Sequence, residues 1–246
     1  MRTERRSVTW WVEQGVARID LDVREQKTKI TPATAQALCD AAEAIELDDR
    51  VSVVVLRGTG RVFCPAGPPE SGPDFVAAFA ALTMPVLAAV NGIASAEGCE
   101  LALACDLRIA SRAAAFCLPQ VREGRLPAHG ATQRLPRMIG RTRALDMLLS
   151  GRRVGASEAA AFGLVSRLVT AAGLDAAVEE EVSLLRSKGP IALRLAKEAV
   201  YKGSDMTMEQ GIRLEQDLYV LLQTTADRAE GVRAFLRKRQ PKFKGR

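Results

Sequence analysis

The stretch "VNGIASAEGCELALACDLRIAS", residues 90–111, carries two glutamates, Glu97 and Glu100, among small and apolar residues where a strand pattern gives way to a helix pattern. The segment "MPVLAAVNGIAS" predicts a strand buried on both faces, and "EGCELALACD" predicts a helix that begins near Glu97. Glu100 falls in the first turn of that helix, where the helix dipole stabilises its ionised form and burial raises its pKa. These opposing effects suit a group that moves protons near neutral pH. The alternative interpretation is that Glu100 only complements the dipole of its helix.

Strand and helix patterns alternate on both sides of this stretch. Upstream, "SVTWWVEQGVARIDLD" predicts two short strands around a Gln14-Gly15 turn, and "VSVVVLRGTG" predicts a buried strand. We therefore expect an α/β core over residues 1–188 and a helical region over residues 189–246, which should pack against another subunit. From about Ser157 onward the pattern contains helices only, at about 174–187, 190–202, 207–223 and 225–239.

The composition indicates a soluble globular protein. Of its 246 residues, 48% are hydrophobic and 26% are charged, which allows a large buried core. No apolar run reaches the roughly 20 residues that span a bilayer, and no signal-peptide core follows the basic N-terminus. The five cysteines lack metal-binding spacing and there is one histidine, so we expect no metal site and reduced thiols in the cytoplasm.

The charge balance favours an anionic partner. The net charge of +6 suits either nucleic acid or a phosphorylated small molecule. Basic residues concentrate modestly in the C-terminal "RAFLRKRQPKFKGR", residues 233–246. Aromatic residues make up only 4% of the chain and are not interleaved with this tail, so nucleic-acid binding is not expected.

Two other segments hold candidate site residues. The loop "FCPAGPP", residues 63–69, follows a buried strand, and such a tight loop can turn its N–H groups toward a ligand. His129 lies where a Gly/Pro-rich loop leads into a helix near residues 130–132. A single histidine is more often structural than catalytic, but this one lies beside the proposed site.

Three long segments are informative when they are taken together and in their order along the chain. They are "PVLAAVNGIASAEGCELALACDLRIASRAAAFCLPQV", "GATQRLPRMIGRTRALDMLLSGRRVGASEAAAFGLVSRLV" and "AEGVRAFLRKRQPKF". Together they resemble the enoyl-CoA hydratase/isomerase (crotonase) family, over nearly the whole chain. The resemblance implies a crotonase-like spiral of ββα units, a helical C-terminal trimerisation region, and trimers that often pair into hexamers. It also implies an acyl-CoA substrate, no other cofactor, and an oxyanion hole of two main-chain N–H groups.

The resemblance places the oxyanion donors on Gly67 and Glu97 and the first catalytic glutamate on Glu100. An alternative alignment puts the first donor on Pro68, which has no N–H, so we prefer Gly67. The family has glycine where this chain has Glu97. The Glu97 N–H can still donate, but its side chain should either point away from the oxyanion or be protonated, because like charges repel strongly in a dry site.

A second departure concerns the other catalytic glutamate of the family's hydratases, which corresponds to Gln120 here. A glutamine orients water but does not carry a proton, and His129 is the better substitute for that role. The resemblance also implies contacts with coenzyme A, whose phosphates basic side chains would meet. The residues expected to make these contacts are Arg24, Lys27, Cys64, Ala66, Gly67 and Lys242.

Three functions stay open on this basis. The first, which we favour, is hydration of a 2-enoyl-CoA to a 3-hydroxyacyl-CoA with Glu100 as both base and acid. The second keeps the oxyanion hole but isomerises a double bond, decarboxylates or changes a C–C bond, for which one carboxylate suffices. The third is a non-catalytic member of the family that binds acyl-CoA or RNA.

Overall fold

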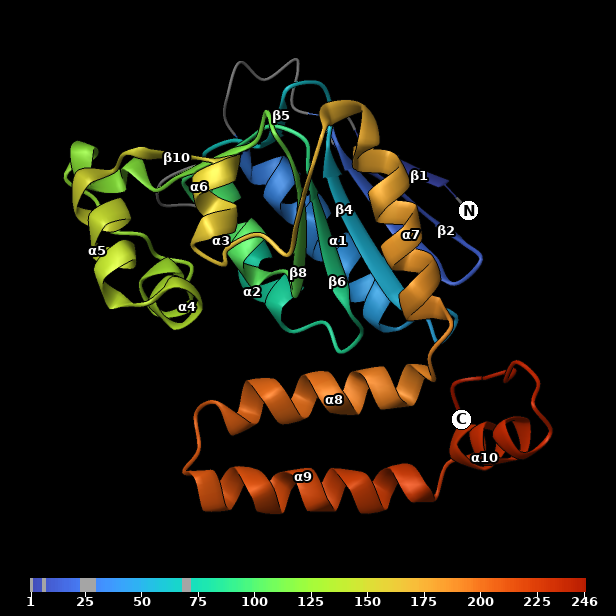
Figure 1. Ribbon diagram of the computed structural model, residues 1–246. Coiled ribbons are helices and arrows are strands. Elements are labelled where there is room, and N and C mark those ends of the chain that lie inside the picture. Colours follow the sequence, from blue (N-terminus) through green and yellow to red (C-terminus); the bar gives the residue numbers. More distant parts are fainter. Residues whose placement is uncertain (1, 6–7, 23–29, 68–71) are drawn as a thin grey trace.

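The structure, a computed structural model, describes residues 2–5, 8–22, 30–67 and 72–246, and within these ranges it contains two sheets (Figure 1). No helix in these ranges is long and apolar enough to cross a lipid bilayer. The strands are β1 Arg2–Arg5, β2 Val8–Glu13, β3 Val16–Leu21, β4 Val53–Gly58, β5 Val62–Cys64, β6 Val86–Val90, β7 Ile93–Ser95, β8 Leu107–Ser111, β9 Ala115–Cys117, β10 Arg153–Gly155 and β11 Arg167–Val169. The α-helices are α1 Pro32–Glu46, α2 Phe75–Ala80, α3 Glu97–Ala104, α4 Ala131–Ile139, α5 Arg141–Ser150, α6 Ala156–Ala161, α7 Leu174–Arg186, α8 Pro190–Gly203, α9 Met208–Gln223 and α10 Ala226–Leu236, with 3-10 turns η2 Pro119–Glu123 and η3 Ala171–Gly173.

The larger sheet has the strand order β1-β2-β3-β4-β6-β8-β11. Its first three strands are antiparallel, and the strands from β3 to β11 run parallel. The predicted hairpin of β2 and β3 is confirmed, with a Gln14-Gly15 turn in which both residues have positive φ. The central strand β4 is a run of buried apolar side chains from Val53 to Leu56, as expected for a strand covered on both faces.

Helices cover both faces of this sheet (Figure 1). On one face, α1, α2 and α3 contribute to the main hydrophobic core. On the other face, α7 packs Leu174, Val178 and Val182 into a second cluster with Val55 and Leu87. The sheet is therefore buried on both sides, which is typical of parallel strands joined by helical crossovers.

Strands follow one another in pairs along the chain. β4 leads into β5, β6 into β7 and β8 into β9, and the second strand of each pair joins the smaller sheet, whose order is β10-β9-β7-β5. The sequence predicted a single strand across 84–95, which is wrong because this segment forms two strands, β6 and β7. Gly92 lies between these two strands, and only glycine fits there, since a Cβ would lie 1.9 Å from the carbonyl oxygen of Arg61. The chain passes from the larger to the smaller sheet at this point, as the ββα pattern requires.

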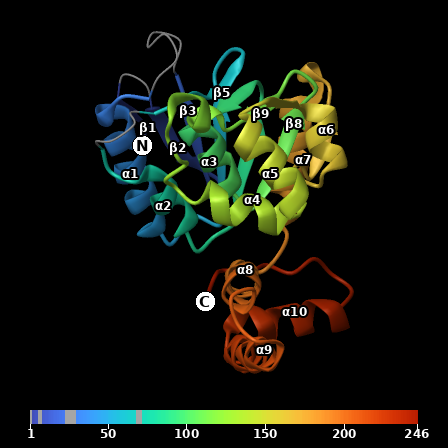
Figure 2. The same cartoon turned by 90° about the vertical axis from the view of Figure 1, so that its left-hand side faces the viewer.

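The expected α/β core with a helical C-terminal region is confirmed, but the prediction of helices only from about Ser157 onward is wrong, since β11 pairs with β8 at the edge of the larger sheet. In Figures 1 and 2, α8 and α9 form a hairpin below the core, and α10 lies beside them with the C-terminus. No residue of α8 or α9 is buried, although both are fully described. Their exposed apolar side chains include Val200, Tyr201, Ile212, Tyr219 and Val220. The hairpin thus carries an apolar surface that a single chain does not cover.

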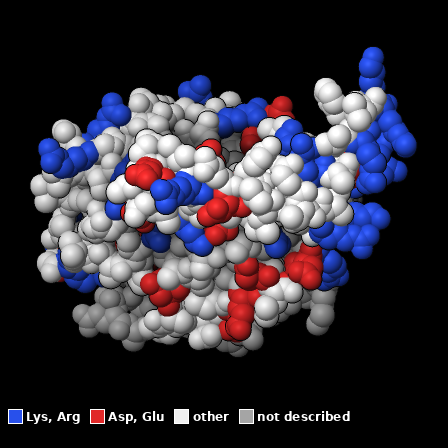
Figure 3. Space-filling model, turned by 90° about the horizontal axis from the view of Figure 1, so that it is seen from below, with Lys and Arg blue, Asp and Glu red and all other residues white. Residues whose placement is uncertain are grey.

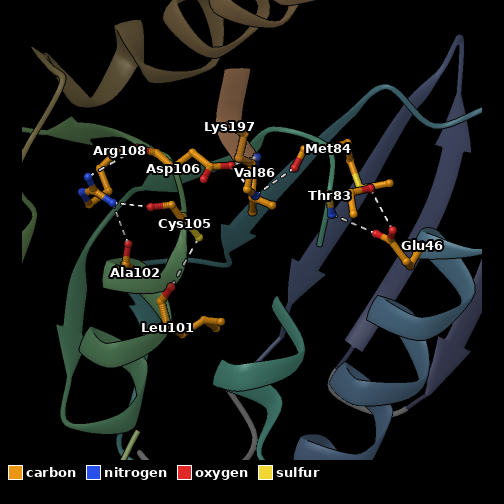
Figure 4. Close-up of polar contacts among 10 residues, drawn as sticks. All are labelled: Glu46, Thr83, Met84, Val86, Leu101, Ala102, Cys105, Asp106, Arg108 and Lys197. Atoms are coloured by element: carbon orange, nitrogen blue, oxygen red, sulfur yellow. Dashed lines mark hydrogen bonds and ion pairs between the residues drawn. The ribbon is translucent and has the colours of Figure 1, made fainter. Parts of the chain in front are cut away.

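A buried polar cluster connects α3 with the larger sheet (Figure 4). The guanidinium of Arg108, on β8, donates to the carbonyl oxygens of Ala102 at 3.1 Å, Cys105 at 2.5 Å and Leu164 at 2.7 Å. The first two carbonyls belong to the end of α3, where a helix leaves its last carbonyl groups without partners. Arg108 therefore caps α3 and complements the negative end of its dipole.

The same cluster joins the helical hairpin to the core (Figure 4). Nζ of Lys197, on α8, lies 2.8 Å from Oδ2 of Asp106 and 3.0 Å from the Met84 carbonyl oxygen. Oδ2 of Asp106 also accepts the N–H of Val86 at 2.7 Å. The ion pair thus attaches α8 to the segments that enter β6 and β8.

Replacement of Arg108 by methionine should lower the free energy of unfolding by about 3 kcal/mol or more, because buried carbonyl oxygens that lose a donor cost roughly 1–3 kcal/mol each. Urea unfolding followed by circular dichroism measures this change. The control is Arg112→Met, at an exposed position directly after β8, which should stay within about 0.5 kcal/mol of the wild type. Equal stabilities of the two variants would contradict the capping role.

Candidate active site

The first turn of α3 lies against the end of β5. A Cβ on Gly98 would lie 2.1 Å from the carbonyl oxygen of Cys64, so only glycine fits at this position. Ala96, directly before the helix, has a φ of 50°, which is unusual for alanine. The close approach brings Gly67 next to Glu97, since a Cβ on Gly67 would lie 3.3 Å from that of Glu97.

Glu97 binds the loop that it faces. Its Oε2 accepts the N–H of Gly67 at 2.7 Å, and its Oε1 lies 3.4 Å from Nη1 of Arg125. Glu97 is only 4% exposed. Of the two expected alternatives, the one in which the side chain points away is wrong, because the packing of α3 on β5 leaves the carboxyl group over the Gly67 amide. The N–H of Glu97 itself is the first in α3 and has no acceptor within the helix.

Glu100 is 0% exposed and binds the start of a second helix. Its Oε1 accepts the N–H of His129 at 2.8 Å and that of Ala131, the first residue of α4, at 3.1 Å. Burial raises the pKa of Glu100 above its ordinary value of 4.5, and the two amide hydrogen bonds oppose this shift. Burial therefore acts on Glu100 as the sequence predicted, whereas the opposing influence comes from the amides of His129 and Ala131 rather than from the predicted dipole of α3.

Gln120 is a polar neighbour of Glu100. It lies in η2, is 1% exposed, and its Nε2 is 3.4 Å from Oε2 of Glu100. The other amide atom of Gln120, Oε1, is buried without a hydrogen-bond partner. An unpaired buried acceptor is costly, so a donor from bound water or substrate would stabilise it.

The His129 ring points toward a different carboxylate. Its Nδ1 lies 2.9 Å from Oδ1 of Asp74, the N-cap residue of α2, and its ring centroid is 6.2 Å from that of Phe75. It is the main-chain N–H of His129 that contacts Glu100. A proton-carrying role for the ring stays a prediction, whereas its amide already belongs to the site.

The residues predicted to contact coenzyme A lie in three separate parts of the sequence. Arg24 and Lys27 lie outside the described residues, as does Pro68 of the alternative alignment. Cys64 and Ala66 lie in the strand and loop that lead to Gly67. The Cys64 thiol is buried, which raises its pKa, and its carbonyl faces α3 rather than a ligand cavity.

Lys242 lies in another part of the chain. Its N–H donates to Oε1 of Glu230 at 3.0 Å, and the residue lines a cavity of 570 Å³ between the C-terminal tail and the start of α8. Neither Glu97 nor Glu100 lines this cavity. In Figure 3, Lys and Arg side chains gather at the right-hand edge of the molecule, which is the side on which the C-terminal tail lies in Figure 1.

Sequence reasoning missed two residues that contact the site, Arg125 and Asp74. No local pattern could link Arg125 with Glu97 or Asp74 with the His129 ring, because the partners lie 28 and 55 residues apart. The amides that hold the Glu100 carboxylate did have a signal. A glycine directly before a helix leaves the first N–H groups of that helix open to an anion.

Comparison with known proteins identifies the family. The model of the enoyl-CoA hydratase/isomerase family matches residues 68–246. The 2,3-dehydroadipyl-CoA hydratase of Escherichia coli K12 is 35% identical, covering 95% of this chain and 97% of that protein. The (E)-benzylidenesuccinyl-CoA hydratase of Thauera aromatica is 34% identical, covering 97% and 99%.

The solved structures agree. The crystal structure of enoyl-CoA hydratase subunit I from Geobacillus kaustophilus HTA426 superposes with a TM-score of 0.92 at 35% identity, covering 99% of this chain and 100% of that one. This chain belongs to the enoyl-CoA hydratase/isomerase family, and the resemblance found in the sequence is confirmed.

The raised pKa of Glu100 predicts a pH-dependent stability. Because the folded state holds this proton more tightly than the unfolded chain, the contribution of Glu100 is greatest below pH 4.5 and is lost as the pH rises through the folded-state pKa. The free energy of unfolding of the wild type, relative to Glu100→Gln, should therefore fall from pH 4.5 upward and then level off. Urea titrations of both proteins measure the difference, and a difference that grows with pH would contradict the assignment.

Proposed function

We propose that this enzyme adds water to a 2-enoyl-CoA and forms the 3-hydroxyacyl-CoA. Membership of the enoyl-CoA hydratase/isomerase family makes the chain an enzyme that acts on CoA thioesters. Two relatives that match almost its whole length are named as hydratases. The observation that carries the proposal is the buried carboxyl of Glu100 beside the unpartnered Oε1 of Gln120.

The thioester oxygen of the substrate would bind between the N–H groups of Gly67 and Glu97. The Gly67 N–H already faces an anionic oxygen, Oε2 of Glu97, at 2.7 Å, which supports its role as a donor to developing negative charge. The Glu97 N–H lies at the N-terminus of α3, where the dipole adds positive potential. Two fixed donors stabilise an enolate oxygen without having to reorient.

Glu100 serves as both base and acid in this mechanism. Water is held by Glu100 and by Oε1 of Gln120, and Glu100 removes one proton as the water oxygen bonds to the β-carbon. The double-bond electrons move onto the thioester as an enolate, and Glu100 then returns the proton to the α-carbon. One water is added without any redox change, so one carboxylate suffices and coenzyme A of the substrate is the only cofactor required.

The same proposal includes the assembly of the enzyme and its location. Residues 189–246 would form the trimer contacts, with trimers paired into hexamers, because the apolar side chains of α9 such as Tyr219 and Val220 are exposed in the single chain. In such an assembly the tail of one subunit, with Lys242, can reach the coenzyme A of another. All five cysteines are described and are free thiols, which suits the reducing cytoplasm.

Variants of Glu100 and Gln120 test the reaction. With crotonyl-CoA, the wild type should form a product heavier by one water, measured by mass spectrometry. Glu100→Gln should lower kcat at least about 100-fold because the proton carrier is lost, and Gln120→Glu should raise kcat about tenfold because a second carrier is gained.

The matched control is Gln133→Glu, the same chemical change at an exposed position on α4, which should leave kcat unchanged. An isomerised product without added water would refute hydration and support the second function considered above, isomerisation of a double bond. Full activity of Glu100→Gln would remove Glu100 from the mechanism.

Sedimentation tests the assembly. The molar mass of the wild type from sedimentation equilibrium should be three or six times the chain mass of 26.5 kDa. Tyr219→Glu should shift the protein toward monomer, because a charge on this apolar surface disfavours burial. Leu47→Glu, at an exposed apolar position after α1, should leave the mass unchanged. A monomeric wild type would refute the proposed assembly.

A further inference from the structure

We infer that the Glu97 carboxylate competes with the substrate for the oxyanion hole, and that Arg125 positions this carboxylate when it is displaced. The inference rests on the proposed function, since it concerns the same pair of N–H donors. Its starting observation is the Gly67 N–H, which would bind the thioester oxygen and instead donates to Oε2 of Glu97 at 2.7 Å.

One N–H group cannot hold two oxygens in good geometry. Hydrogen bonds to an ionised acceptor are about twice as strong as those between neutral groups, and a thioester carbonyl is neutral before the reaction begins. Glu97 therefore retains the Gly67 N–H in the empty enzyme, and a substrate must displace it. Because Glu97 is only 4% exposed, a displaced carboxylate needs another partner near its present position.

Arg125 provides that partner. Its Nη1 lies 3.4 Å from Oε1 of Glu97, a distance that can shorten once Glu97 leaves Gly67. Its Nε and Nη2 lie 3.0 and 2.8 Å from Oε2 of Glu123 and hold the guanidinium in place. The Arg125 side chain is partly exposed, so a carboxylate drawn toward it moves away from the buried Gly67 amide.

The competition affects binding rather than chemistry. The cost of moving Glu97 is the same for a bound substrate and for its transition state, so it raises KM and leaves kcat unchanged. Alanine at position 97 would keep the main-chain N–H and remove the competing oxygen. In the position that the family fills with glycine, this chain therefore carries a residue that sets the affinity for the thioester.

Glu97→Ala tests the competition directly. Butyryl-CoA, a saturated thioester that cannot be hydrated, should bind about tenfold more tightly to Glu97→Ala by calorimetry, since one charge-assisted hydrogen bond no longer has to be broken. With crotonyl-CoA, KM should fall and kcat should stay within about twofold. In protein labelled with 15N-glycine, the amide proton signal of Gly67 should shift upfield when the carboxylate is removed.

Arg125→Met tests the positioning role. It should weaken butyryl-CoA binding severalfold in the wild-type background and have no further effect in Glu97→Ala, where no carboxylate needs a partner. Glu179→Ala removes a carboxylate from another Glu–Arg pair, with Arg18 on the opposite side of the larger sheet, and should leave binding unchanged. If Glu97→Ala does not fold, Glu97→Gln should give a smaller gain in affinity, because a neutral amide oxygen is a weaker acceptor.

The outcomes separate this inference from the proposed reaction. Tighter butyryl-CoA binding by Glu97→Ala, without turnover of enoyl-CoA by either protein, supports the inference and refutes hydration. Unchanged affinity with intact turnover refutes the inference alone, and so does an unmoved Gly67 signal. Loss of kcat in Glu97→Ala would make Glu97 a proton carrier and overturn its role as competitor. Equal weakening by Arg125→Met in both backgrounds would mean that Arg125 contacts the ligand itself.

Discussion

The contact of α3 with β5 at Gly98 is the constraint on which the geometry of the site depends. With no side chain at position 98, the first turn of the helix lies directly against the Cys64 carbonyl. The loop after β5 and the N-terminus of α3 then share one small space, in which Gly67 lies next to Glu97. The proposed oxyanion hole would thus depend on backbone packing, because both of its donors are main-chain N–H groups.

Glu100 extends this constraint to a third segment. Its carboxylate binds the amides at the start of α4, so the group proposed to move protons also holds the loop that contains His129. Arg108 binds the carbonyl groups at the opposite end of α3. The short helix is therefore fixed at both ends by buried charged or polar side chains, which hold the proposed donor at Glu97 within the core of the fold.

Local sequence patterns predicted the parts of the structure that depend on neighbouring residues. The Gln14-Gly15 turn, the buried strand at Val53 and the position of Glu100 at a helix N-terminus all follow from residues within one or two turns. The division of the strand at Gly92 could not be predicted, since the close approach at this glycine is to the carbonyl of Arg61, in a distant segment of the chain.

The same limit applied to the site. Residue types and the family resemblance indicated which residues would meet, but the direction of the Glu97 side chain depends on how closely two ββα units approach each other. This distance is a property of tertiary packing.

The hairpin of α8 and α9 differs from the core, because none of its residues is buried within the chain. Every described strand of both sheets precedes this hairpin in the chain, so these strands leave the ribosome before the apolar helices emerge. The order of synthesis thus allows the α/β core to fold before the exposed apolar side chains of α8 and α9 emerge.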